Sequence, residues 1–180
     1  MKLLIASDIH GSLYYSNELK KAIDNENPDK IILLGDLLYH GPRNNLPCDY
    51  QPKEVINFLN TYKEKILCAR GNCDTEVDQM VLNFPIMSDY LVLMVDGICF
   101  YFSHGHKYNI DNPLPLSEGD IFISGHTHIP GCKEKDGVLY LNPGSISIPK
   151  ENTPHSYLIY ENKMFTWKNM DGETYMNQEI

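Results

Sequence analysis

The sequence has few basic residues and no long apolar run. Lysine and arginine total 15 against 24 aspartate and glutamate residues, which gives a formal net charge of -9. Such a surface repels nucleic-acid backbones, so we expect no specific nucleic-acid binding. No stretch approaches the ~20 apolar residues of a membrane span, and the apolar run at the start is too short for a signal-peptide core. We therefore expect neither a nucleic-acid-binding protein nor a membrane protein.

Cysteines are few, and none forms a Cys-x-x-Cys pair. There are five, an odd number, and two of them (Cys68 and Cys99) lie within apolar runs, where they are small core residues. This pattern argues against a disulfide framework and against a zinc ribbon. It favours a reducing compartment, so we expect a cytoplasmic protein.

Low-complexity tracts and internal repeats are also absent. Hydrophobic residues make up 42% and charged residues 22% of the chain, which is the composition of a globular protein. A chain of 180 residues can bury about two thirds of its surface. We expect residues 1–180 to form a single domain that needs no disulfide to hold its core.

The first half of the chain alternates strand and helix patterns. Unbroken apolar runs predict buried parallel strands, and apolar residues at helical spacing separate them. The predicted strands are residues 3–6, 30–34 and 66–69, and the predicted helices are residues 13–26, 53–62 and 76–82.

The second half is mostly strand. Asp96-Gly97 is a favoured two-residue turn, so residues 90–95 and 98–103 are predicted to form a hairpin. Short strands are predicted over 121–124, 138–141, 156–160 and 164–167. Two mixed sheets packed together, with helices outside, accommodate both halves, which places the fold in the α/β (α+β) class.

Polar residues follow five of the predicted strands. They form the blocks Asp8-Ile9-His10-Gly11, Gly35-Asp36, Gly71-Asn72-Cys73-Asp74, His104-Gly105-His106 and Ser124-Gly125-His126-Thr127-His128. Ligands of open α/β sheets gather at the carboxyl ends of strands, so we expect these blocks to converge. The candidate metal ligands are Asp8, His10, Asp36, Asn72, His104, His126 and His128.

Seven groups are too many for one tetrahedral metal ion. Imidazole and carboxylate together are typical ligands of divalent transition metals. Shared over two ions, with one carboxylate bridging, the set gives each ion about four protein ligands. We therefore predict a site for two divalent metal ions.

The five blocks, in this order, resemble the signature of the calcineurin-like metallophosphoesterases. Three further stretches, 40–44, 76–80 and 142–150, resemble the YfcE-type bacterial phosphodiesterases in particular. The similarity runs from Met1 to about Lys150. Each block alone is a weak signal, whereas the five together are highly specific. The resemblance implies a four-layer αββα sandwich.

The resemblance also assigns the ligands. It implies that Asp8, His10 and His128 hold one ion, that Asn72, His104 and His126 hold the other, and that Asp36 bridges them. Manganese is the metal usual for the family, and iron, zinc, nickel and cobalt also fit these ligand types. A hydroxide between the ions would attack phosphorus in line with the leaving alkoxide.

The chain departs from the family at Cys73. Many relatives carry histidine after the asparagine of the third block, where it is positioned to protonate the leaving group. A thiol is a poor substitute. Either a neighbour such as His106 takes this role, or the enzyme favours good leaving groups, so we expect modest catalysis on unactivated esters.

Further candidate residues surround the predicted ligands. Asp74 is expected to orient a ligand, and with Asp36, Asn72 and His106 it completes the candidate catalytic set. The candidate substrate-binding residues are Arg43, His40 and Cys73, because a guanidinium suits phosphate. Each has a simpler reading: single aspartates cap helices, His40 and Arg43 order their loop, and Cys73 is inert. His155, far from any block, is expected to lie on the surface.

Taken together, the sequence predicts a dinuclear metal-dependent phosphodiesterase acting on small phosphate diesters. One alternative is a phosphomonoesterase on the same site. Another is a binding module that kept the fold and lost catalysis, like relatives that resemble a sorting-complex subunit. Self-association into a homodimer or higher homo-oligomer is also expected from the family.

Overall fold

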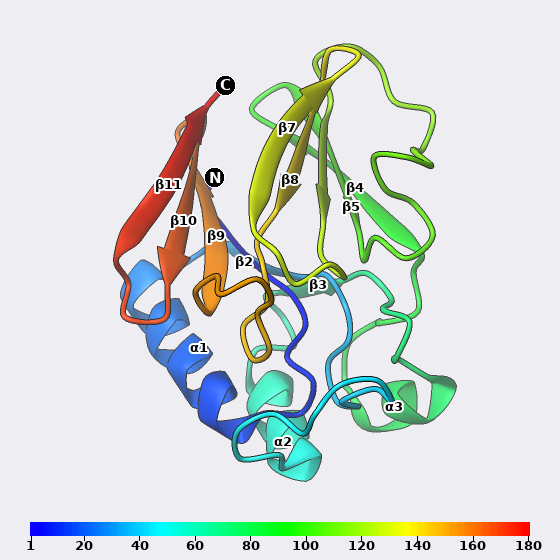
Figure 1. Ribbon diagram of the computed structural model, residues 1–180, viewed down its shortest axis with the longest axis vertical. Coiled ribbons are helices and arrows are strands. Elements are labelled where there is room, and N and C mark those ends of the chain that lie inside the picture. Colours follow the sequence, from blue (N-terminus) through cyan, green and yellow to red (C-terminus); the bar gives the residue numbers. More distant parts are fainter.

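The computed structural model describes residues 1–180, and its strands form two mixed sheets (Figure 1). In the first sheet, three parallel strands continue into an antiparallel meander. Its order is β11 (Thr174–Glu179), β10 (Met164–Asn169), β9 (Ser156–Glu161), β1 (Leu3–Ala6), β2 (Lys30–Leu33) and β3 (Ile66–Cys68). Helical crossover connections between these strands account for the parallel pairing of β1, β2 and β3.

The second sheet has a parallel centre and antiparallel edges. Its order is β4 (Tyr90–Val95), β5 (Ile98–Ser103), β6 (Ile121–Ser124), β8 (Val138–Asn142) and β7 (Gly131–Lys135). β4 and β5 form the predicted hairpin, while β5, β6 and β8 run parallel. Both sheets therefore deliver the carboxyl ends of several strands to one place.

Helices cover the first sheet on the side away from the second sheet (Figure 1). They are α1 (Leu13–Glu26) and α2 (Pro52–Thr61), whose buried faces join the apolar core beneath β1, β2 and β3. The Ser12 side chain caps α1 by accepting from the Tyr15 amide, and Asn27 ends it in the left-handed conformation. A third, short helix, α3 (Glu76–Val81), buries no side chain.

Large aromatic side chains fill the space between the sheets. Phe100 and Phe102 from the second sheet and Phe165 and Trp167 from the first are fully buried there. The Trp167 indole N–H donates to the carbonyl of Asn142 at 2.7 Å, which satisfies its one polar atom and ties the sheets together. This core fixes the two sheets relative to each other.

An irregular segment covers the outer face of the second sheet. Leu114 packs there on Phe122 and Val138, with Tyr108 and Leu116 beside them. The predicted sandwich of two mixed sheets is confirmed, and its helices lie on the first sheet. The layer over the second sheet differs from the expected helix because residues 107–120 carry prolines and apolar residues without helical spacing.

Two strands, β7 and β11, were absent from the sequence-based prediction. Both are edge strands, with the sequences GCKEK and TYMNQE, and most of their side chains are exposed. An edge strand that buries little needs no apolar alternation, so periodicity does not reveal it. Among the helices, none is both long and apolar enough to cross a membrane.

Candidate metal centre

The five polar blocks lie directly after five strands and meet at one rim. Three blocks follow β1, β2 and β3 of the first sheet, and two follow β5 and β6 of the second. The site is thus built where the two sheets meet, and its geometry depends on the core between them. The candidate ligands that it brings together are Asp8, His10, Asp36, Asn72, His104, His126 and His128.

Five of these candidate ligands have a left-handed backbone. Their φ angles are 59° at Asp8, 49° at His10, 54° at Asp36, 68° at His126 and 63° at His128. A residue with a Cβ in this region costs about 1 kcal/mol or more. The tight turns are needed to aim each side chain back over the strand end. Strain concentrated in one cluster is typical of functional sites.

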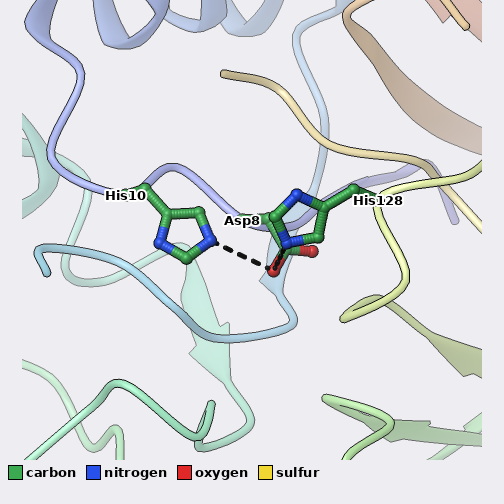
Figure 2. Close-up of side chains that lie close together, drawn as sticks. All are labelled: Asp8, His10 and His128. Carbon is green, nitrogen blue, oxygen red and sulfur yellow. Dashed lines mark ion pairs between the residues drawn. The ribbon is translucent and has the colours of Figure 1, made fainter. Parts of the chain in front are cut away.

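Asp8 is the centre of the first group of ligands. Its carboxylate is completely buried, and Figure 2 shows His10 and His128 approaching the same oxygen from two sides. Asp8 Oδ1 lies 3.2 Å from His128 Nε2 and 3.6 Å from His10 Nε2. Burial alone would raise the pKa of Asp8, but the contacts with His10 and His128 outweigh it and hold this pKa well below its usual range.

Two buried atoms in this group have no hydrogen-bond partner, Asp8 Oδ1 and His10 Nε2. Buried polar atoms are nearly always paired, because leaving one unpaired costs about 1–3 kcal/mol. Together with His128 Nε2, these atoms lie within 4.8 Å of one another. A cation between them would satisfy all three, so the residues present fit a divalent metal ion.

The second group of ligands surrounds His104. Its Nε2 atom lies 2.9 Å from Asn72 Oδ1 and 3.1 Å from His126 Nδ1. Burial and the neighbouring His104 lower the pKa of His126 to about 4, so its ring is neutral at pH 7. Lone pairs from an amide oxygen and two rings thus converge on one point, which suits a second cation.

Asp36 lies between the two groups. Its Oδ2 atom is 3.6 Å from His10 Nε2 on one side and 3.5 Å from His104 Nε2 on the other. Its Oδ1 atom accepts a hydrogen bond from the Cys73 amide at 2.7 Å, which fixes the carboxylate plane. Asp36 thus lies close to one histidine of each group.

Backbone carbonyls hold the histidine rings in one tautomer. The Nδ1 atoms of His10, His104 and His128 donate to Tyr39 O, Leu34 O and Ile148 O at 2.7–2.8 Å. Each ring therefore turns Nε2 toward the site. Such hydrogen bonds from the far ring nitrogen are the usual support of metal-binding histidines.

Asp74 supports the site without facing the ligands. Its buried carboxylate accepts from the amides of Asp36, Leu37 and Gly71 at 2.7–2.9 Å. Gly71 is required here because a Cβ would collide with the Asp36 carboxylate. Asp74 thus joins the turn after β2 to the turn after β3.

Replacing Asp74 by Ala should destabilise the protein strongly. Three buried amides would lose a charged acceptor, and we expect the free energy of unfolding to fall by about 3–5 kcal/mol. Urea denaturation of the metal-free protein measures this. The exposed Asp111→Ala serves as control, and a loss under 1 kcal/mol for Asp74→Ala would contradict the assigned role.

The stretch of residues 142–150, which begins Asn-Pro-Gly-Ser, supports Asp8 from behind. The hydroxyls of Ser145 and Ser147 both donate to the Asp8 carbonyl at 2.9 Å. His155, which the sequence suggested as a surface histidine, is half-buried instead, and its Nδ1 donates to Ile146 O at 2.7 Å. The stretch is therefore scaffold beneath the first group of ligands, and His155 belongs to it.

His106 and His40 lie beside the centre. The His106 ring centroid is 5.3 Å from that of His104, and burial lowers the His106 pKa. The His40 ring makes edge contacts with Tyr39 and Tyr50 and orders its loop. Each has a buried Nδ1 without a partner.

A polar cavity of about 400 Å³ opens over the centre. Arg43 and Cys73, both suggested from sequence, line it together with the ligand residues. Lys150 and Thr127 line it as well, although sequence reasoning assigned them no role. The signals available were a lysine at the end of the Asn-Pro-Gly-Ser stretch and a threonine between two histidines.

Comparisons with known proteins identify the family of this chain. The model of the calcineurin-like phosphoesterase superfamily domain matches residues 1–164. Phosphodiesterase YfcE of Escherichia coli K12 is 39% identical over 166 residues, covering 92% of this chain and 90% of YfcE. Phosphodiesterase MJ0936 of Methanocaldococcus jannaschii is 26% identical over 152 residues, covering 80% and 83% of the two chains.

Solved structures show the same fold. The E. coli phosphoesterase Yfce has a TM-score of 0.97 at 37% identity and covers all of both chains. Vps29 of Entamoeba histolytica, complexed with zinc, has a TM-score of 0.61 at 18% identity and covers 99% of both chains, which shows the fold alone. With the family model matching most of its length, this chain belongs to the calcineurin-like phosphoesterase superfamily.

Proposed function

We propose that this protein is a dinuclear metal-dependent phosphodiesterase that hydrolyses small phosphate diesters. The observation that carries the proposal is the convergence of two groups of ligands on either side of Asp36, the first of which holds two buried atoms without a hydrogen-bond partner. The relatives named phosphodiesterases support the choice of reaction. The polar cavity above the centre is large enough for a small substrate.

The two ions would be held as the sequence suggested. One ion would bind Asp8, His10 and His128, the other Asn72, His104 and His126, with Asp36 shared. We propose manganese as the native metal, because mixed oxygen and imidazole ligands suit it, and iron, zinc, nickel and cobalt are the alternatives. When bound, the two cations supply a nucleophilic water at neutral pH and neutralise phosphate charge.

The chain's own residues bind and orient the substrate. Arg43 and Lys150 are far apart in the sequence but line the same cavity. Both place positive charge over an otherwise acidic centre. A guanidinium can hold two phosphate oxygens at once. Hydrogen bonds from backbone amides, including that of Cys73, keep the carboxylates of Asp36 and Asp74 fixed while substrate binds.

Turnover of bis(4-nitrophenyl) phosphate and 4-nitrophenyl phosphate tests the reaction class. With Mn²⁺ supplied, we expect a higher kcat/KM for the diester. Faster turnover of the monoester would favour the phosphomonoesterase alternative. No turnover of either ester by fully metal-loaded protein would favour a binding module with this fold.

Replacing Arg43 by Ala should weaken substrate binding. We expect KM for an aryl diester to rise about tenfold, because a charge-assisted contact with phosphate contributes about 1.4 kcal/mol or more. Lys133→Ala, which removes an exposed lysine of β7, is the matched control. An unchanged KM in Arg43→Ala would remove Arg43 from the substrate site.

Leaving-group dependence tests the role of Cys73. Burial and the nearby Asp36 raise the pKa of this thiol, so it is a weak proton donor. Because general acid catalysis contributes about 10²–10⁴ in rate, we expect alkyl diesters to be cleaved at least about 100-fold more slowly than aryl diesters. Equal rates would show that another group, such as His106, protonates the leaving alkoxide.

We further propose a cytoplasmic enzyme that self-associates. All five cysteines are free, which suits a reducing compartment. Edge strand β4 exposes Tyr90, Val92 and Met94, each at 44% or more, on one face. A second copy covering this face would bury them, and light scattering of the purified protein measures the assembly.

A further inference from the structure

A second, apolar pocket of about 450 Å³ lies next to the polar cavity. Its apolar wall comes from the segment after β2, from α2 and from α3. Cys73 lines both the pocket and the cavity, so the two adjoin at this residue. The residues of the apolar wall used below are Leu38, Tyr39, Tyr50, Ile56, Val77 and Val81.

Several of these side chains are exposed although they are apolar. Val77 is 68% exposed, Val81 42% and Tyr39 43%. Val77 and Val81 are four residues apart on α3, so they face the same way. Apolar side chains gathered around a concave surface mark a binding site more often than apolar residues scattered singly.

Helix α3 presents these valines although none of its own residues is buried. It has no buried side chain, whereas most helices in proteins are stabilised by packing an apolar face. Hydrogen bonds hold it instead: Thr75 and Asp78 form a capping box, the Gln79 side chain bonds to Phe84 O and the Ile86 amide, and Asn60 of α2 donates to Val81 O. The apolar face of α3 is therefore free for a ligand.

We propose that this pocket binds one ester arm of the substrate, and that the arm is aromatic. The inference rests on the proposed phosphodiesterase function: Cys73 lines both the cavity over the metal centre and the pocket, so an ester arm of a phosphate held in the cavity would lie next to the pocket. Tyrosine rings and branched aliphatic side chains suit the flat face of an aryl group or a nucleobase. The substrate class is thus a phosphate diester with at least one aryl or nucleoside arm.

Binding of two phosphonates tests the pocket without turnover. Phenylphosphonate and methylphosphonate carry the same anionic group, are not hydrolysed, and differ only in the arm. Titration calorimetry on the metal-loaded protein should show phenylphosphonate binding at least about tenfold more tightly. The Val77→Asn/Val81→Asn double variant should reduce this preference to about twofold, because polar groups line the pocket instead.

Met80→Asn is the matched control. Met80 lies on the same helix, is 82% exposed and does not line the pocket, so the preference should stay near tenfold. Equal binding of both phosphonates by the wild-type protein, or an unchanged preference in the double variant, would overturn the pocket assignment while leaving diester hydrolysis intact. Failure to bind either phosphonate, together with absent turnover, would overturn the proposed function itself.

Discussion

Asp36→Asn should reduce kcat/KM for an aryl diester by about 10³-fold or more. Asp36 Oδ2 lies between His10 and His104, so its negative charge serves both proposed ions at once. Asparagine keeps the size of the side chain and an oxygen for the Cys73 amide, but it loses the charge that holds two cations together. A loss of transition-state stabilisation of about 4 kcal/mol corresponds to this factor.

The metal content of the Asp36→Asn variant must be measured together with its kinetics. We expect the variant to bind fewer than two ions per chain by elemental analysis and to keep its circular dichroism spectrum. Asp111→Asn, on the exposed segment over the second sheet, is the matched control and should behave as the wild type. A variant that retains two ions and full activity would show that Asp36 does not bridge.

Removing the metal ions should abolish activity and lower the melting temperature. The unpaired buried atoms Asp8 Oδ1 and His10 Nε2, and the facing lone pairs around His104, are unfavourable without a cation between them. A ligand at about 1,000 times its Kd stabilises the folded state by about 4 kcal/mol, which corresponds to roughly 10 °C for a domain of this size. Refilling with two equivalents of Mn²⁺ should restore both properties.

Differential scanning calorimetry of chelated and refilled protein measures this change. In Asp36→Asn the same refilling should raise the melting temperature by less, because one shared ligand has lost its charge. Protein that is free of metal by elemental analysis yet still hydrolyses the diester would contradict a metal-dependent mechanism.

The sequence predicted the parts of the fold that apolar patterning controls. The buried strands β1 and β2, and the strand β5 that follows the hairpin turn at Asp96-Gly97, appear within a residue of the predicted bounds. Prediction failed where solvent, not the core, surrounds the chain. Edge strand β7 is almost entirely polar and exposed, β11 packs only Met176 on the core, and the segment 107–120 covers a sheet without regular structure.

The candidate ligands could be named from sequence because each follows a strand at its carboxyl end. The contacts that support these ligands could not be predicted from the sequence. The three amides that reach Asp74 and the carbonyls that orient the histidine rings come from turns whose dihedral angles no local pattern specifies. The apolar pocket was likewise hidden, because Tyr39, Ile56 and Val77 belong to three separate segments.

The left-handed residues at the centre have a consequence for engineering this protein. Glycine would have a lower conformational energy than the residue present at five positions of the centre, namely Asp8, His10, Asp36, His126 and His128. A redesign that ranks substitutions by backbone conformational energy would therefore select these five positions for replacement by glycine. In this chain, the positions at which glycine would lower the backbone energy are those whose side chains are the candidate metal ligands.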